Sequence, residues 1–128
     1  MTEEKLNKWV KTLEKFMHNP VPDDIHSQIE HLQQAISLFA LQGIIMEAAT
    51  LVHQEGKGDV LKSYMDGLDN GSYGDMKAHE FRMWTDGKMA GYEALFHRAE
   101  RTVKAFDKYI DGLRTIISAN KSEKMQTT

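Results

Sequence analysis

The stretch MAGYEALFHRAERTVKAFDKYIDGLRTII, residues 89–117, decides the fold. Apolar residues recur in it at alternating spacings of three and four, the heptad pattern by which a helix lays one apolar stripe against a neighbour. We therefore predict a helix over residues 88–120, roughly 50 Å long at 1.5 Å per residue. The apolar positions are Met89, Tyr92, Phe96, Ala99, Val103, Phe106, Ile110, Leu113 and Ile117.

A second long helix is predicted over residues 24–54, with Asp23 or Asp24 as its N-cap. Between positions 38 and 52 it is apolar on nearly every side, and Glu47 is its only charge there. A helix that is apolar all round is buried all round. A chain of 128 residues would struggle to surround such a helix, so we expect it to meet a partner chain. Its heptad positions are Ile25, Ile29, Leu32, Ile36, Phe39, Gly43 and Met46.

Shorter helices are predicted over residues 2–18, 59–66 and 75–84. The first ends before Pro20 and Pro22, because proline disfavours helix at the residue before it. Gly56 and Gly58 are expected to stop the second long helix, and Thr85-Asp86-Gly87 to break or bend the chain before the last one. A loop is expected at 69–75, and a frayed tail at 121–128.

These elements predict one all-α domain over residues 1–128. No alternating strand pattern and no repeat of solenoid period compete with the helical periodicity. The expected architecture is a bundle built on two long antiparallel helices, at about 24–54 and 88–120, with the three shorter helices packed around them.

Composition narrows the function classes. The chain has no cysteine, which excludes disulfides, thiolate metal sites and cysteine nucleophiles. Its net charge of −3 argues against a nucleic-acid-binding surface, which usually carries a positive excess. No uninterrupted run of 18 apolar residues and no signal-peptide pattern occur, so we expect no membrane span and a cytoplasmic location.

Patterns for catalysis and metal binding are weak. A calcium loop beginning at Asp66 or Asp69 lacks oxygen ligands at required positions, and no Glu-x-x-His or Gly-x-Ser-x-Gly occurs. His and Glu stand four apart at Glu14–His18, His26–Glu30 and Glu93–His97, but each pair supplies two ligands at most. We therefore predict no catalytic residues, no metal site and no cofactor.

Glu47 is the most informative single residue. A lone carboxylate in an apolar stretch must be paired or must lie at a rim. In an antiparallel hairpin of the two long helices, Lys88 or Arg98 could reach Glu47 and form a partly buried ion pair that sets the register. An exposed rim carboxylate is the alternative interpretation.

Aromatic residues gather around the glycine-rich loop and the expected break. This group consists of Tyr73, Phe81 and Trp84, and Tyr92 follows in the helix predicted over residues 88–120. Such a group is typical of a protein-binding hot spot, although aromatic residues also close the end of a bundle. Tyr73, Phe81 and Trp84 are therefore candidate interaction residues, together with Glu47, Lys88 and Arg98.

The sequence favours a non-enzymatic protein–protein interaction module. We expect a homodimer or higher oligomer that docks on another protein by burying apolar surface. In size, lack of cysteine and lack of catalytic signatures, the chain resembles small accessory proteins encoded by phages or mobile elements. Two alternatives stay open: a helical bundle that binds or sequesters a small ligand, and a helical metal-dependent hydrolase.

Overall fold

The computed structural model describes residues 2–69, 71 and 77–126. All regular secondary structure in this part of the chain is helical. The four helices are α1 (Thr2–His18), α2 (Ile25–Ser37), α3 (Phe39–Asp69) and α4 (Ala78–Gln126). The predicted all-α helical bundle with two long packed helices is thus confirmed.

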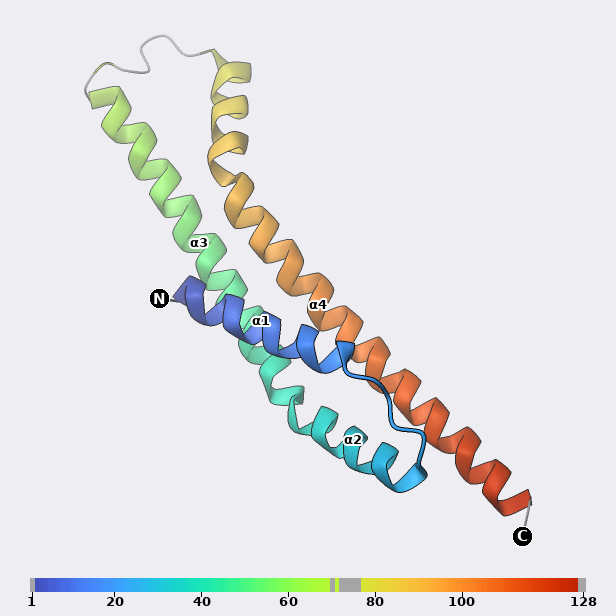
Figure 1. Ribbon diagram of the computed structural model, residues 1–128. Helices are drawn as coiled ribbons and strands as arrows, with labels where there is room; N and C mark the ends of the chain where they lie inside the picture. The colour runs from blue at the N-terminus through green and yellow to red at the C-terminus, as the bar shows by residue number, and fades with distance from the viewer. Residues whose placement is uncertain (1, 70, 72–76, 127–128) are drawn as a thin grey trace.

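Helix α4 runs the length of the molecule, and α2 and α3 follow one another along it in the opposite direction (Figure 1). Helix α1 lies across the middle of α3 and α4 and contacts both. The ends of α3 and α4 that face the connecting loop extend beyond α1 (Figure 1). The bundle therefore has a middle of three helices and a tip of two.

The core lies where α1 meets α3 and α4. Completely buried side chains from all three helices meet there, among them Leu13, Ile45 and Phe106. All nine heptad positions of the 89–117 stretch are buried or half-buried. The buried core residues are Leu6, Val10, Leu13, Ala35, Ile45, Ala48, Ala49, Val52, Ala99, Phe106, Ile110 and Leu113.

The single helix predicted over residues 24–54 is wrong. The structure has two helices there, α2 and α3, and α3 continues beyond residue 54. Asp24 does cap α2, since its carboxylate accepts the backbone N–H of Ser27 at 3.0 Å. Helix α2 nevertheless ends at Ser37, where the Leu38 N–H bonds the Ala35 carbonyl in a tighter turn. The Ser37 hydroxyl bonds the Gln34 carbonyl at 2.6 Å, a local bond that bends helices.

The glycines at 56 and 58 do not stop the helix. Helix α3 continues through both to Asp69, so the predicted short helix over 59–66 is its final part. Gly56 is instead a point of close approach, because a Cβ there would lie 2.5 Å from Cγ of Tyr92. Packing of the Tyr92 ring on the glycine offsets its helix penalty of about 1 kcal/mol.

The helices predicted over 75–84 and 88–120 are one helix. The sequence left open whether the chain breaks, bends or continues at Thr85, Asp86 and Gly87, and helix α4 passes through all three without interruption. A single glycine lowers helix stability but does not end a helix that packing supports. The predicted tail at 121–128 is helical as far as Gln126, and residues 127 and 128 lie outside the described part.

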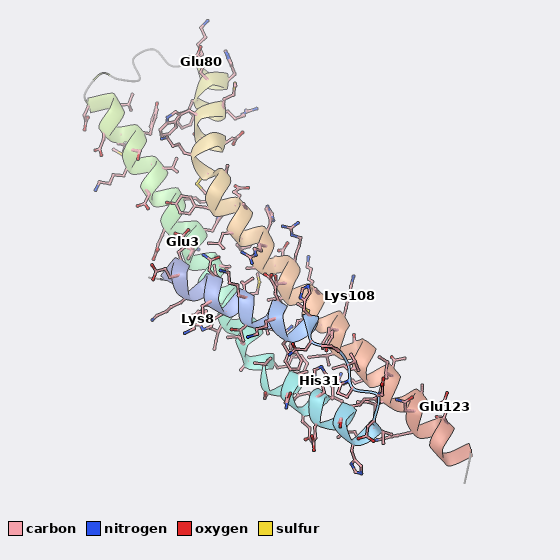
Figure 2. The ribbon with its side chains drawn as sticks, in the orientation of Figure 1. Glu3, Lys8, His31, Glu80, Lys108 and Glu123 are labelled. Carbon is pink, nitrogen blue, oxygen red and sulfur yellow. The ribbon has the colours of Figure 1, made fainter. Side chains whose placement is uncertain are left out.

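An aromatic layer joins α1, α2 and α4 below the core. The imidazole of His31 is buried, stacks on Phe16 at 4.6 Å and lies 2.6 Å from the Tyr109 hydroxyl through Nε2. Its ring points between the three helices (Figure 2). Phe106 and Phe39 extend the layer, with ring centroids 6.4 Å apart. Burial raises the pKa of the Tyr109 phenol above its usual 10.0.

Helices α2 and α3 are more apolar than the fold alone requires. An 18-residue window within Ile25–Asp69 has a mean hydropathy of 1.8, enough by length and composition for a membrane span. This differs from the expectation drawn from the lack of an uninterrupted apolar run. Only 33% of that window is buried, so much of its apolar surface is uncovered by the other helices.

Replacing Gly56 by alanine is expected to destabilise the protein by about 1–3 kcal/mol, because the new methyl group overlaps the Tyr92 ring. Gly87→Ala is the matched control, since nothing lies within 4 Å of its Cβ position. That control should gain up to about 1 kcal/mol from helix propensity. Urea unfolding followed by circular dichroism measures both, and equal effects of the two substitutions would contradict the close approach.

Tyr109→Phe tests the raised phenol pKa. The folded protein holds the Tyr109 proton more tightly than the unfolded chain, so its contribution to stability is intact below about pH 10 and is lost as the pH rises above that value. The variant loses the His31 contact, worth about 1 kcal/mol, but should lose less further stability between pH 9 and 11 than the wild type. Parallel pH profiles from urea unfolding would refute the assignment.

Candidate functional site

The two-helix tip is the candidate functional site. Beyond the Gly56–Tyr92 contact, the last turns of α3 and the first turns of α4 pack on each other without α1 (Figure 1). Two helices alone leave much of each helix uncovered. Leu61, Met65 and Leu68 of α3 and Phe81 and Met83 of α4 are all exposed.

Three aromatic side chains hold the tip together. The Tyr64 ring lies 4.6 Å from Phe81 and 5.9 Å from Trp84, measured between ring centroids. Phe81 and Trp84, one helical turn apart on α4, are stacked at 6.4 Å. The ammonium group of Lys88 lies 6.0 Å from the Trp84 ring centroid, at the outer limit of a cation–π contact.

A cavity of about 320 Å³ opens between α3 and α4 beside these rings. Its walls are mainly apolar, and its charged groups, Lys57, Asp86 and Glu93, are exposed at the rim. Thr85 also lines it, and the hydroxyl oxygen of this residue is buried without a hydrogen-bond partner in the described part of the chain. The lining residues are Lys57, Val60, Leu61, Tyr64, Phe81, Trp84, Thr85, Asp86, Met89 and Glu93.

Polar groups below the cavity interact weakly. Glu93 lies 3.7 Å from the imidazole of His53 and 4.0 Å from that of His97. The Tyr92 hydroxyl donates to Asp59 at 3.5 Å. Among the described residues, no group of three or more His, Asp or Glu side chains is placed to hold a metal ion.

A second hollow, of about 480 Å³, follows one side of α1. All of its lining residues belong to that helix, including Lys8, Lys11 and Lys15. Since no second element walls it, it is a shallow surface feature and offers a ligand no enclosure. The tip cavity is the smaller but better-formed site.

Three of the predicted interaction residues come together at the tip: Phe81, Trp84 and Lys88. Tyr73, which was predicted to belong to the same aromatic group as Phe81 and Trp84, lies outside the described residues. Tyr64 was not among the predicted interaction residues, because the single continuous helix α3 that brings it to Phe81 was not predicted. Its heptad-like spacing from Val60 and Leu61 was the available signal.

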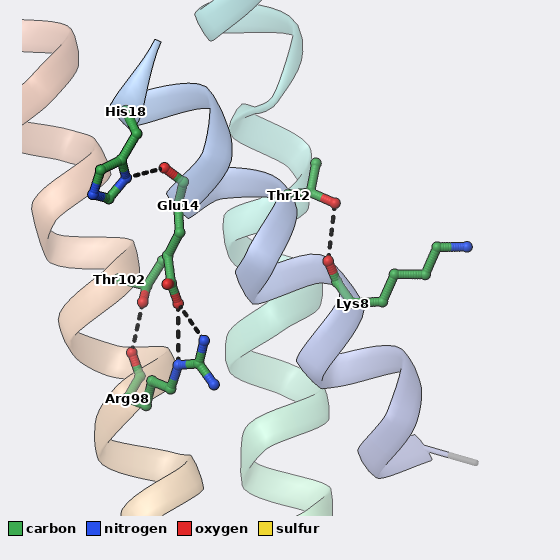
Figure 3. A network of polar contacts seen from close by, with 6 residues as sticks. All are labelled: Lys8, Thr12, Glu14, His18, Arg98 and Thr102. Carbon is green, nitrogen blue, oxygen red and sulfur yellow. Dashed lines mark hydrogen bonds and ion pairs between the residues drawn. The ribbon is translucent and has the colours of Figure 1, made fainter.

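The ion pair predicted for Glu47 is wrong. Arg98 contacts Glu14 of α1, with Nε and Nη2 at 3.1 and 3.0 Å from the same carboxylate oxygen (Figure 3). Glu47 is exposed, and no ion pair to it occurs among the described residues. The alternative interpretation of Glu47 as an exposed carboxylate therefore agrees with the structure. Lys88 lies at the tip beside Trp84, away from both.

Helix α1 explains why Arg98 has another partner. Its Leu6, Val10 and Leu13 are completely buried against α3 and α4, which places Glu14 beside α4. The ion pair of Glu47 was predicted from a hairpin of the two long helices alone, in which α1 was not included. Arg98 thus fastens α1 to α4 in the body of the bundle, and neither Glu47 nor Arg98 lines the tip cavity.

No protein-family model, curated protein or solved structure matches this chain.

The Glu14–Arg98 pair is expected to have a coupling energy of about 1 kcal/mol or less. Both side chains are about a third or more exposed, so solvent screens the attraction. A double-mutant cycle with Glu14→Gln and Arg98→Gln, read by urea unfolding, measures it. The pair Lys104–Glu100, within α4, is the control and should give no more than about 0.5 kcal/mol. A cycle giving several kcal/mol would contradict this screened geometry.

Proposed function

We propose that the protein is a non-enzymatic interaction module that self-associates and docks on another protein through its tip. The observation that supports this most directly is the apolar surface left uncovered at the tip. Met83 is 72% exposed and Phe81 37% exposed, although both are large apolar residues. Contiguous apolar surface of this kind marks interaction sites in soluble proteins.

The tip has the composition of a protein-binding hot spot. Tyr64 and Trp84 form a rigid aromatic pair, and the charges of Asp86 and Glu93 stand around it rather than within it. Interfaces commonly have this arrangement of an aromatic centre and a polar rim. Burial of apolar surface at about 25 cal/mol per Å² then supplies the binding energy, and no chemical step is needed.

The tip cavity favours one alternative, a protein that binds or sequesters a small molecule. Its volume of about 320 Å³ falls at the lower end of ligand pockets. The buried Thr85 hydroxyl would supply a single polar contact inside it. A small molecule that co-purifies in stoichiometric amount, and is lost in Trp84→Ala, would favour this alternative over the interaction module.

Trp84→Ala is expected to abolish capture of a protein partner from lysate of the native host by the purified, immobilised protein. The substitution removes the largest ring of the tip without touching the core around α1. Ile116→Ala is the matched control, because its side chain is exposed on α4 but lies outside the tip, and it should leave capture within about twofold of the wild type. Quantitative mass spectrometry of the eluates measures the difference.

Equal retention by Trp84→Ala and the wild type would contradict the tip as a docking site. A strictly monomeric chain that retains no protein above background would contradict the proposed function itself. Circular dichroism of both variants must match the wild type, since the loss has to arise at the surface.

A further inference from the structure

Helix α3 carries a second apolar stripe on the side away from the core. Its residues alternate by four and three positions along the helix, and every one of them is exposed. We call this stripe the outer seam. It consists of Ala40, Ile44, Glu47, Leu51, Gln54, Gly58, Leu61, Met65 and Leu68.

The outer seam is distinct from the face that α3 uses inside the fold. Ile45, Ala49 and Val52 face α1 and α4 and are almost completely buried. Ile44 and Leu51 lie on the opposite side of the helix and are 44% and 47% exposed. A heptad pattern on a free face is the arrangement by which one helix packs along another helix.

We propose that the outer seam binds the outer seam of a second copy of this chain, with the two α3 helices antiparallel and Glu47 level with Gly58 of the second copy. This deepens the proposed function and rests on it, because it names the surface through which the protein self-associates.

Charge and size along the seam select the antiparallel orientation. A parallel pair in register would set Glu47 against Glu47 and Gln54 against Gln54 at the centre of the contact. In the antiparallel pair, Glu47 meets Gly58, where no atom lies within 4 Å of the Cβ position and a carboxylate therefore has room. Lys57 of the second copy lies beside that glycine and supplies the opposite charge.

The same alignment matches the apolar positions. It places Ile44 level with Leu61 and Ala40 level with Met65 of the second copy, and two-fold symmetry repeats each contact. Within one chain, Glu47 and Lys57 are roughly 15 Å apart along the helix and do not pair. Contact between these two residues therefore reports on association of two chains.

Glu47 and Gln54 also argue against a lipid surface as the occupant of the seam. Both lie on its midline, where a membrane would take them into hydrocarbon without partners. A second copy instead offers Lys57 to the Glu47 carboxylate, and the same alignment places Gln54 level with Leu51 near the centre of the contact. The seam thus suits a partner with complementary polar positions.

Charge reversal tests the proposal in sedimentation equilibrium of the full chain. Glu47→Lys opposes two lysines at each of two symmetric contacts and should raise the dimer dissociation constant at least tenfold. Glu47→Lys combined with Lys57→Glu restores the pairs and should return the constant to within about threefold of the wild type. The dependence on salt should be strongest for Glu47→Lys, because like charges repel less when screened.

Leu51→Glu is a second disrupting variant, with Ile116→Glu as its control. Both residues are similarly exposed on long helices, but only Leu51 belongs to the seam. Leu51→Glu should give a folded monomer, whereas Ile116→Glu should sediment like the wild type. Neither replacement removes a core residue, so circular dichroism should show unchanged helix content.

Spin labels measure the orientation directly, because the chain has no native cysteine. With a label at Met65→Cys, the two labels of an antiparallel pair should be separated by roughly 37 Å along the axis. A label at Leu51→Cys should give a much shorter distance. Short distances at both positions would indicate a parallel pair and overturn the proposal.

The outcomes separate this inference from the proposed function. A dimer that is indifferent to Glu47→Lys and Leu51→Glu overturns the outer seam but leaves an oligomeric interaction module. A wild-type chain that is monomeric at 500 µM and binds vesicles of phosphatidylcholine and phosphatidylglycerol overturns the seam in favour of a lipid surface. Retained capture by the tip, in either case, keeps the docking part of the proposed function.

Discussion

The packing of one continuous apolar stripe on α4 against every other helix is the constraint on which the structure depends. Phe106 at its centre is completely buried, and aromatic or aliphatic side chains from α1, α2 and α3 surround it. Because α4 is far longer than the other helices, its neighbours change along its length. A layer of three helices in the middle gives way to a pair at the tip (Figure 1). Apolar residues at the tip, such as Phe81 and Met83, are accordingly exposed.

This change of neighbours divides the molecule into a body that holds the fold and a tip that presents surface. In the body, α1 closes the groove between α3 and α4 and is fastened by Arg98 to Glu14. At the tip neither α1 nor α2 covers the pair, so Tyr64, Phe81 and Trp84 pack among themselves and leave apolar residues of the described part exposed. Apolar surface that the chain itself does not cover is the physical basis for proposing interaction rather than catalysis.

The outer side of α3, like the tip, has apolar surface that the other helices do not cover. Helix α3 is apolar on two opposite faces, and the three other helices can reach only one of them. The excess of apolar residues between positions 38 and 52 was visible in the sequence, and so was the solitary charge of Glu47. Which face is covered depends on the docking of α1, and therefore on contacts between residues far apart in the sequence.

The sequence by itself determined the all-α class, a bundle with two long packed helices, a cap at Asp23 or Asp24 and the heptad face that α4 buries, because helical periodicity and capping are local properties. It also singled out Phe81 and Trp84 as members of one aromatic group, whereas it assigned Lys88 to Glu47. Only the tertiary structure decided the lengths of the helices. Local propensity predicts that α3 ends at Gly56 and Gly58, but the packing of Tyr92 on Gly56 stabilises a helix that continues through both. The tertiary structure likewise decided that Arg98 pairs with Glu14 and that Glu47 faces outward, because long-range contacts, and not spacing along the chain, choose the partners of charged side chains.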